Sequence, residues 1–580
     1  MQNNIDPFQL EVIKNCFDAI ADDMALTLMR TSHSGIVRDS LDFSTAICDG
    51  EGQTLAQGIC TPMHMGSFYD AMRNMLAEYE GRIHPRDVFI FNDPIAAAGQ
   101  HLPDIYICMP IFYRDRLRAW STTIAHHSDV GGIVAGSNAI GGTEIFQEGL
   151  RLPVVKFIEG GKPNQALWDV IALNVRTPGK VMGDLQAQMA ACNSGEREMI
   201  DLFERYGVDS VLDYGNHIQD YAERLTRAEI TDLPDGTYAF TDHIDGLGYN
   251  PETIYLKAKV IVKGDTITVD WTGSSPQVEA GINPYFPFTK AASYAAIRSV
   301  MEADIPNCHG FTRPITVVAP LGCIVNPVFP APCGARGITG YRIIDCLMGA
   351  LSQAVPERVT ADSNGGSTLP TIAGYQNGTP FVFCETFMGT WGGAIEHDGQ
   401  AGVPHMGANQ SNVSIEMIEA DYPIQIEEYG MVPDTGGAGR HRGGLALVRQ
   451  YRILSDRAIL NVRSDKRKYP PHGLFGGKEG SSSINLINPG SEDRMLPVLM
   501  LEVEKLEKGD VFRHVMSGGG GYGDPLEREP GLVLEDIITE KVTPNHARSE
   551  YGVVIDLSGV APAIDAAATE TLRGEMRKEA

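Results

Sequence analysis

The chain has 580 residues, of which 43% are hydrophobic and 21% charged, and these ordinary values for a globular protein exclude wholesale disorder. The length predicts several domains, each with room for a core. The net charge of -27 disfavours nucleic acid and anionic membrane surfaces as partners, because a polyanion requires a basic footprint on the protein that binds it.

The amino terminus, MQNNIDPFQLEV, lacks the basic segment and apolar stretch of a secretory leader. No run approaches the roughly 18 apolar residues that a membrane span needs. We therefore expect a cytoplasmic protein. The ten cysteines include no CxxC pair, which argues against a zinc ribbon or a disulfide framework.

The first predicted element is an amphipathic helix over residues 6–31, with apolar side chains three and four residues apart. Asp22 and Asp23 lie within it, and the periodicity alone favours solvated acids on the outer face. A strand at 41–48 and a turn follow, with Asp39 and Asp42 at the entry to the strand. A second helix is predicted at 68–79, after TPMHMGSF, which contains His64.

A β-hairpin is predicted next. Two apolar, β-rich runs at 105–113 and 117–124 flank the charged loop formed by residues 114–116. If Tyr113 pairs with Leu117, the numbers of paired residues sum to 230. Asp104 then lies opposite His126 at the open end of the hairpin.

His101 lies one short turn before Asp104, so the hairpin gathers His101, Asp104 and His126. Converging imidazole and carboxylate groups suit a divalent metal ion. A second carboxylate would balance the cation, and Asp39 and Asp42 are the local candidates. The alternative is that histidines at strand ends only bond backbone carbonyls.

The rest of the chain alternates between helical and β-rich stretches. The loop after the hairpin offers Glu144 and Glu148 to line a cleft. Helices are predicted at 166–175, 183–204, 213–230, 290–303, 340–354, 532–540 and 544–551. Residues 231–272 alternate apolar and polar side chains with Asp-Gly and Gly-Asp turns, which is typical of antiparallel strands.

The predicted fold class is mixed α and β (α+β) and multidomain, with a helix-rich amino-terminal half that carries the hairpin metal site and a β-rich middle and carboxy-terminal half. The predicted divisions are a metal-site domain at 1–230, a β-rich segment with helices at 231–360, a Gly-rich β segment with terminal helices at 361–555, and a disordered tail at 556–580.

No dinucleotide fingerprint, P-loop or GxSxG elbow is present. The glycine run MSGGGGYGDP at 516–525 is followed by neither Gly-Lys-Ser/Thr nor an immediate helix, which favours a tight turn where backbones approach closely. Any ATP that the chemistry requires would have to be bound by another chain.

Several stretches resemble the hydantoinase B and oxoprolinase family, over roughly residues 6–555. They occur in the family's order and include RDSLDFSTAICD, NDPIAAAGQHLPDI, AHHSDVGG, WTGSSPQVEAGIN, PDTGGAGRHRGGLALVRQY, RSDKRKYPPHGLFGGKEG and SGGGGYGDPLEREP. The family comprises the metal-bearing subunits of ATP-dependent cyclic amide hydrolases and of related ketone carboxylases.

The resemblance implies that the metal ligands are His101, Asp104 and His126. Where many relatives carry a fourth ligand, Glu, this chain has Asp39, which is one methylene shorter, and Asp42 is the substitute. Asp23 matches an acidic position in the family's first helix and becomes a candidate general base, with His127 as another proton acceptor. Zinc and manganese both suit such a mixed shell.

The function that the resemblance implies is ATP-dependent opening of a cyclic amide such as 5-oxoproline, a hydantoin or a lactam. A partner resembling hydantoinase A would bind ATP-Mg and phosphorylate the carbonyl oxygen, in a heterodimer or a dimer of heterodimers. One alternative is a component of a ketone carboxylase that uses bicarbonate. A second alternative is a non-catalytic structural subunit.

Overall fold

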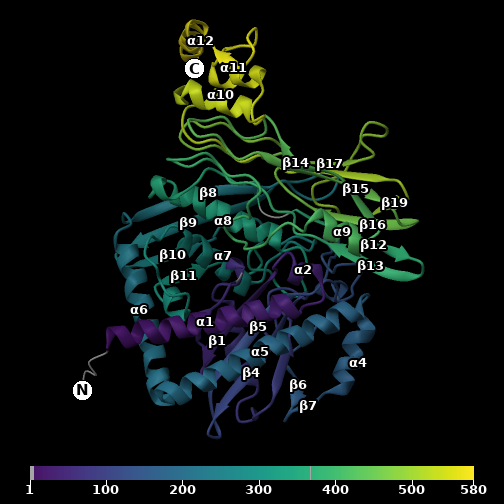
Figure 1. Cartoon of the computed structure of the whole chain (residues 1–580). Coiled ribbons are helices and arrows are strands. Elements are labelled where there is room, and N and C mark those ends of the chain that lie inside the picture. The colour runs from purple at the N-terminus through teal and green to yellow at the C-terminus, as the bar shows by residue number, and fades with distance from the viewer. Residues whose placement is uncertain (1–5, 60, 366–367, 580) are drawn as a thin grey trace.

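The computed structural model describes residues 6–59, 61–365 and 368–579, and within these ranges no helix is both long and apolar enough to cross a membrane. It is a mixed α and β structure, as predicted (Figure 1). The nine described cysteines are free, and all but Cys16 are buried. Cys60 lies outside the described residues.

The amino-terminal part is built on a seven-stranded sheet in the order β2-β1-β5-β4-β3-β6-β7. Its strands are β1 (Phe43–Asp49), β2 (Thr54–Gln57), β3 (Val88–Phe91), β4 (Asp104–Tyr113), β5 (Arg116–His126), β6 (Val155–Glu159) and β7 (Lys162–Pro163). The helices of this part are α1 (Pro7–Thr31), α2 (Gly35–Arg38), α3 (Ser67–Glu78), α4 (Gln165–Asn174), α5 (Pro178–Tyr206) and α6 (Val208–Thr231).

Alternate residues of the central strands enter two different cores, because successive side chains of a strand point to opposite faces of the sheet. Tyr106 and Cys108 pack with α3 on one face. Ile105 and Ile107 pack with α5 on the other face, where α1 also crosses the sheet (Figure 1). The sheet is therefore covered by helices on both sides.

The hairpin of β4 and β5 confirms that Asp104 pairs with His126, but the predicted three-residue loop is wrong. Tyr113 pairs with Arg116, so the loop is Arg114-Asp115 alone, and both residues have positive φ, of 50° and 60°, as in a type I′ turn. A bulge beside Ile111 then adds one residue to β5. From Ile111 back to Asp104, toward the open end of the hairpin, the bulge restores the predicted register.

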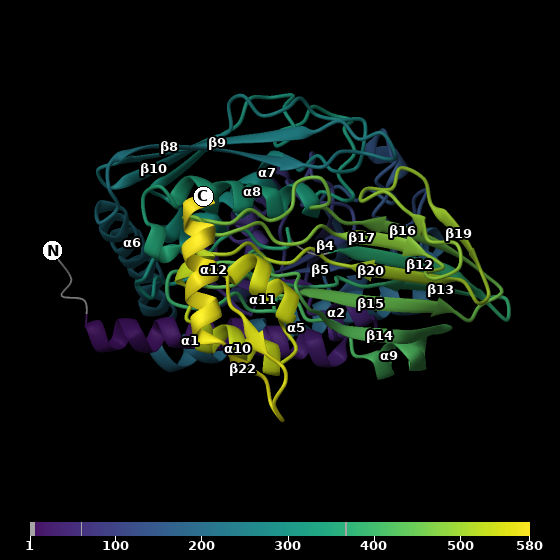
Figure 2. The ribbon, with the colours of Figure 1, turned by 90° about the horizontal axis from the view of Figure 1, so that it is seen from above.

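The middle of the chain packs two helices, α7 (Phe286–Ser299) and α8 (Gly337–Leu351), with a sheet in the order β11-β10-β9-β8. These strands are β8 (Gly236–Ile244), β9 (Ile254–Lys263), β10 (Thr266–Asp270) and β11 (Ile315–Val318). Every residue of α8 is buried, so this helix runs through the interior rather than over the surface (Figure 2).

Two further sheets enclose one apolar core in the second half of the chain. One has the order β13-β12-β16-β19 and the other β14-β15-β20-β17-β18. Their strands are β12 (Leu369–Gln376), β13 (Thr379–Cys384), β14 (Ile424–Val432), β15 (Ala446–Ile453), β16 (Arg457–Arg463), β17 (Ile484–Ile487), β18 (Arg494–Met495), β19 (Glu504–Glu507) and β20 (Val511–Val515). Helix α9 (Ile415–Asp421) packs beside β14.

The carboxy-terminal end differs from the predicted disordered tail. After α10 (Pro530–Ile538) and α11 (Pro544–Tyr551), the chain forms the strand pair β21 (Ile555–Asp556) and β22 (Ala563–Ile564) and the helix α12 (Ala566–Glu579). Arg573 donates to the carbonyls of Tyr551 and Arg528, and these bonds hold the helix in place. The unit projects from one end of the molecule (Figure 1). The predicted domain boundaries stay a prediction.

The glycine run at 516–525 does bring backbones into close approach, but it is hydrogen-bonded to distant segments. A Cβ atom at Gly518 would lie 1.8 Å from the carbonyl oxygen of Thr435, and one at Gly520 would lie 2.0 Å from that of His472. Gly520 donates to the carbonyl of Asp362 and accepts from Gly393. We call the stacked segments around residues 393, 437, 473 and 518–521 the glycine layer.

Gly58, just after β2, shows how closely α1 approaches the sheet. A Cβ atom there would lie 2.4 Å from the carbonyl oxygen of Ala21 in α1, which is also the acceptor of the Thr45 hydroxyl at 2.8 Å. We expect Gly58→Ala to lower the free energy of unfolding by about 1–3 kcal/mol, because backbone must move to admit the methyl group. Urea unfolding followed by fluorescence measures this change.

Gly50→Ala is the matched control, since Gly50 lies at the other end of the same β1–β2 hairpin and a Cβ there meets nothing closer than 3.5 Å. Its unfolding free energy should stay within about 0.5 kcal/mol of the unsubstituted chain. Equal losses for the two variants would contradict the close approach at Gly58.

Candidate metal centre

Three neighbouring strands end together and place one polar residue each in a row. In the pairing of β1 with β5, Phe43 lies opposite Ala125, and the backbone N–H of His126 donates to the carbonyl of Asp42 at 3.0 Å. In the pairing of β4 with β5, Asp104 lies opposite His126. Directly paired residues point to the same face of a sheet. Asp42, His126 and Asp104 therefore lie side by side on the face covered by α3.

His101 joins this row from the loop before β4. The backbone N–H of Asp104 donates to the carbonyl of His101, which makes the predicted short turn, and His101 Nε2 lies 3.3 Å from Asp104 Oδ1. The Asn92 side chain fixes the same loop by donating to the carbonyl of Leu102 at 2.7 Å. The His101 and His126 ring centroids are 5.0 Å apart.

The free ring nitrogens of these histidines point to a ligand. His101 Nδ1 is bonded to the carbonyl of Gly334 at 2.8 Å, so Nδ1 carries the proton and Nε2 keeps its lone pair. Both ring nitrogens of His126 are buried without a hydrogen-bond partner within the described ranges. Ligand atoms of His101, Asp104 and His126 all lie within 4.8 Å of one another. This donor set fits a divalent ion such as zinc or manganese.

The row lines a cavity of about 30 Å³, which has room for an ion and bound water. Side chains from the first, middle and last parts of the chain enclose it. The lining residues are Asp42, Thr61, Met63, His64, His101, Asp104, His126, Phe288, Arg336, Gly337, Tyr341, Gln410 and Arg463. The wall is thus assembled from segments that are distant in sequence.

Burial and charge set the protonation of the cavity. Burial lowers the pKa of His64 and of His101 to about 4 and that of His126 well below its usual value, so all three rings are neutral near pH 7. Burial, reinforced by the charge of Asp104, raises the pKa of Asp42 to about 7. For Asp104, burial opposes ionisation, but His101 and Arg336 outweigh it and hold the pKa well below its usual value.

The structure brings Asp42, and not Asp39, to the candidate ligands. Asp39 ends α2, and its carboxylate accepts two hydrogen bonds from the Arg38 guanidinium, at 2.9 and 2.8 Å. Asp39 is absent from the cavity wall, because it lies at the end of α2, before the chain enters β1.

The two candidate proton acceptors also lie outside the cavity. Asp23 is exposed on α1. His127 follows His126 along the chain, so it points to the opposite face of the sheet, where its Nε2 bonds Gln188 of α5 at 3.0 Å. Of the two predicted cleft acids, Glu144 is exposed, whereas Glu148 is buried and accepts the backbone N–H groups of Cys333 and Gly334.

Sequence reasoning gave no role at the centre to His64 or to the two arginines of the wall. His64 Nδ1 bonds Ser44 Oγ at 2.9 Å, and its Nε2 lies 3.8 Å from Asp104 Oδ2. Arg336 forms an ion pair with Asp104, and Arg463 ends β16. Arg463 opens the motif RSDKRK that carries part of the family resemblance, so the motif was the available signal.

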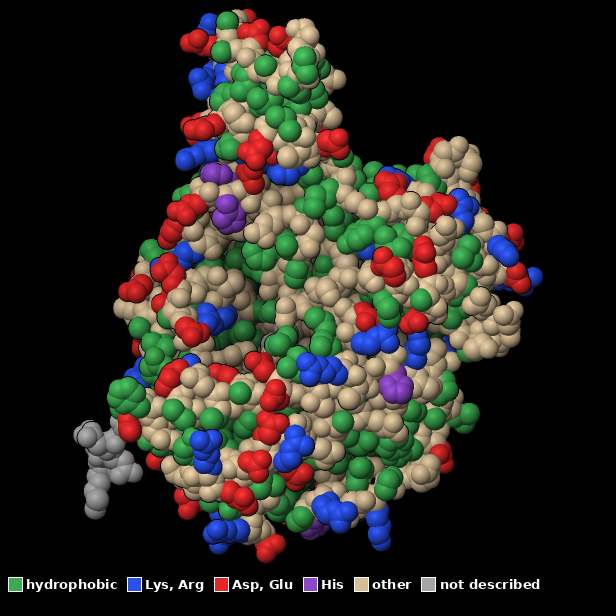
Figure 3. All heavy atoms as spheres, viewed as in Figure 1, with side chains coloured by type: hydrophobic (Ala, Val, Ile, Leu, Met, Phe, Trp, Pro, Cys, Tyr) green, Lys and Arg blue, Asp and Glu red, His purple; other side chains and the backbone are tan. Residues whose placement is uncertain are grey.

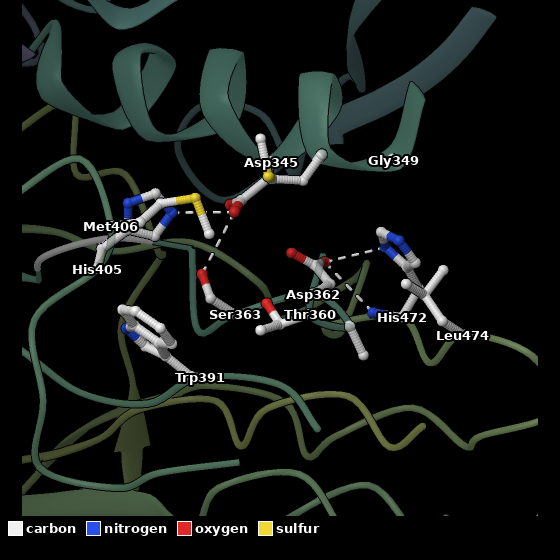
Figure 4. A pocket seen from close by; sticks show the side chains of 12 residues that line it. Asp345, Gly349, Thr360, Asp362, Ser363, Trp391, His405, Met406, His472 and Leu474 are labelled. Atoms are coloured by element: carbon white, nitrogen blue, oxygen red, sulfur yellow. Dashed lines mark hydrogen bonds and ion pairs between the residues drawn. The ribbon is translucent and has the colours of Figure 1, made fainter. Parts of the chain in front are cut away.

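A second polar cavity, of about 10 Å³, lies farther along α8 and has room for about one water molecule. Figure 4 shows Asp345 of α8 facing His405 and Ser363 on one side and Asp362 paired with His472 on the other. His472 Nδ1 lies 3.1 Å from Asp362 Oδ2, and Lys466 forms an ion pair with the same carboxylate. These groups tie the carboxy-terminal half to α8.

The comparisons with known proteins decide the family. The hydantoinase B/oxoprolinase model matches residues 6–525. This chain belongs to that family. It is 34% identical to the B component of a putative D-/L-hydantoinase from a Pseudomonas species (strain NS671), over 95% of each chain. It is 32% identical to the beta chain of the caprolactamase of Pseudomonas jessenii, over 98% of this chain and 99% of that one.

Solved structures show the same fold. The crystal structure of the ATP-dependent caprolactamase from Pseudomonas jessenii matches with a TM-score of 0.91 and 30% identity, over 99% of this chain and all of that one. Acetone carboxylase matches with a TM-score of 0.89 over 99% of this chain and 83% of that chain, but at 18% identity this likeness concerns the fold alone.

The charge of His472 should make stability depend on pH. Burial lowers the pKa of His472, but Asp362 outweighs it, so the pKa lies above its ordinary value. The stabilisation is complete below the ordinary pKa of about 6.5 and is lost as pH rises through the higher pKa of the folded protein. The difference in melting temperature between the unsubstituted chain and His472→Gln should therefore shrink from pH 6 to pH 9.

His397→Gln is the control for this measurement, because His397 is exposed and its ring bonds a neutral backbone carbonyl, that of Asp398, rather than a carboxylate. Its melting-temperature difference should stay flat with pH. A difference for His472→Gln that is equally flat would show that the pairing with Asp362 does not hold a proton.

Proposed function

We propose that this chain is the metal-bearing subunit of an ATP-dependent cyclic amide hydrolase that opens 5-oxoproline, a hydantoin or a lactam. The observation that carries the proposal is the row of Asp42, His126 and Asp104 with His101 beside it, in a buried cavity with free imidazole nitrogens. The relatives named as parts of a hydantoinase and of a caprolactamase support the substrate class.

The proposal includes a partner of the hydantoinase A type that binds ATP-Mg. The hydantoinase and caprolactamase relatives match this chain over nearly all of its length, and each is named as one subunit of its enzyme. The chain has no nucleotide-binding motif that we recognise. The partner would phosphorylate the amide carbonyl oxygen, and the two chains would form a heterodimer or a dimer of heterodimers.

The residues that would hold the ion are His101, Asp104 and His126, with Asp42 rather than Asp39 as the fourth ligand. A zinc or manganese ion bound there would lower the pKa of water toward neutrality. The protein's own part is to keep the imidazoles neutral by burial, to orient His101 through the carbonyl of Gly334, and to restrict water by enclosing the cavity.

Proton transfer in this scheme falls to the cavity wall. His64 lines the cavity with the row, whereas Asp23 and His127 do not, and its Nε2 lies 3.8 Å from Asp104. We therefore infer that His64 relays a proton within the cavity without retaining it, because burial lowers its pKa to about 4, while Ser44 bonds its Nδ1.

Metal content distinguishes the two aspartates. We expect roughly one ion per purified chain, a loss of most of it in His101→Ala and Asp42→Asn, and no loss in Asp39→Asn, the matched control from the same segment. Elemental analysis measures the ion, and circular dichroism checks that the variants stay folded. If Asp39→Asn lost the metal and Asp42→Asn kept it, Asp39 and not Asp42 would be the fourth ligand.

Turnover with the partner tests the reaction. We expect ATP hydrolysis by the reconstituted complex to be stimulated by at least one cyclic amide without bicarbonate, and the stimulation of ring opening to be lost in His101→Ala. Product formation by chromatography and phosphate release are the measurements. Stimulation only by a ketone with bicarbonate would move the protein to the carboxylases, and full ring opening by a metal-free His101→Ala chain would rule out the centre.

A further inference from the structure

Three sources of positive charge meet on one wall of the metal cavity. Arg336 is the N-cap residue of α8, and Gly337 is the first residue of this 15-residue helix. A Cβ atom on Gly337 would lie 3.2 Å from Nη1 and 3.3 Å from Nη2 of Arg463. The Arg463 guanidinium therefore lies directly against the N-terminus of α8, where the helix dipole is positive.

Neither guanidinium has its hydrogen-bonding capacity filled. Arg336 and Arg463 are 5% and 6% exposed, and the Nε of each is buried without a hydrogen-bond partner in the described part of the chain. Arg463 donates from Nη1 to Asn138 Oδ1 at 3.3 Å, a neutral acceptor. A buried guanidinium without a paired carboxylate is costly, so its retention beside a cavity points to a ligand.

The charge balance of the cavity identifies the sign of that ligand. Asp42 and Asp104 are the carboxylates of its wall, Arg336 and Arg463 are its two guanidinium groups, and imidazoles that ligate a metal do so as neutral rings. If both carboxylates serve a divalent ion, as in the proposed function, the two guanidinium groups and the helix terminus are left without counter-charges. The loaded cavity then carries an excess of about two positive charges and favours a dianion.

We propose that Arg463 and the first turn of α8 bind the phosphoryl group of the activated substrate beside the metal centre. The inference rests on the proposed function. A planar guanidinium and a helix N-terminus are both suited to phosphate oxygens, and a phosphoryl group carries the required charge near pH 7. Gly337 belongs to the site because its missing side chain lets the Arg463 guanidinium lie against the helix.

The test uses the full chain loaded with manganese, with inorganic phosphate as the probe. Bound manganese speeds the ³¹P relaxation of a phosphate held next to it, so a relaxation titration gives both proximity and affinity. We expect Arg463→Gln to weaken phosphate binding at least about tenfold, a loss of about 1.4 kcal/mol, with manganese content unchanged. Gly337→Ala should also weaken it, because its methyl group displaces the guanidinium without removing a charge.

Arg457→Gln is the matched control, because Arg457 is exposed at the other end of the same strand, β16, and should leave phosphate binding unchanged. Methyl phosphate, a phosphate ester, is the second probe, and its binding supports a site for the phosphorylated substrate. Binding of inorganic phosphate alone would overturn that assignment and identify a site for the released product. Acetate should not displace either probe.

The two proposals fail in different ways. An unsubstituted chain that takes up no manganese or zinc would overturn the proposed metal centre. Two results would overturn the phosphoryl site and leave the metal centre standing. In the first, the chain holds manganese but does not enhance the relaxation of phosphate. In the second, the enhancement is the same in Arg463→Gln, in Gly337→Ala and in the unsubstituted chain. If Arg463→Gln loses its circular dichroism signal, Gly337→Ala decides the question.

Discussion

The pairing of β5 with its two neighbours is the constraint on which the candidate centre depends. His126 is the last residue of β5, and the registers on either side place Asp42 and Asp104 next to it on one face. A shift of either register by one residue would turn the corresponding aspartate to the α5 side. The two-residue turn at Arg114-Asp115 and the bulge beside Ile111 hold the register of β4 with β5. The packing of α3 and α5 on opposite faces of the sheet holds this register and also that of β1 with β5.

Helix α8 supplies the second constraint, because it is buried along its whole length and yet carries charges. Arg342 lies among Asp242, Asp345 and Asp465, and His405 bonds the other side of Asp345. Buried charges persist only when they are paired, so this helix can sit in the interior only if segments from the middle and the end of the chain supply the partners. The same helix presents its N-terminus to the metal cavity. On the face in Figure 3, by contrast, acidic and basic side chains are interspersed.

The sequence predicted the helices of eight or more residues up to α11, the hairpin and the trio of His101, Asp104 and His126, because each rests on local periodicity or on one short register. It missed the short helices α2 and α9 and predicted disorder where α12 forms. The sequence left both Asp39 and Asp42 as candidates for the fourth ligand. Residue spacing does not show that α2 ends at Asp39 or that Arg38 binds the Asp39 carboxylate. The register between β1 and β5 decides the geometry, and that pairing joins residues about 80 positions apart. Arg336 and Arg463 reach the cavity only through tertiary packing, which no local pattern reveals.

The glycine layer also bears on the order in which the protein is built. Its segments, around residues 393, 437, 473 and 518–521, contact one another through their backbones. The layer can therefore form its full set of contacts only after all four segments have been synthesised. Contacts this distant in sequence form slowly, whereas the strand pairings that place Asp42, Asp104 and His126 join residues that all lie between positions 42 and 126. During synthesis the imidazole and carboxylate ligands can therefore assemble early. Arg463, in contrast, can join them only after β16 has been synthesised.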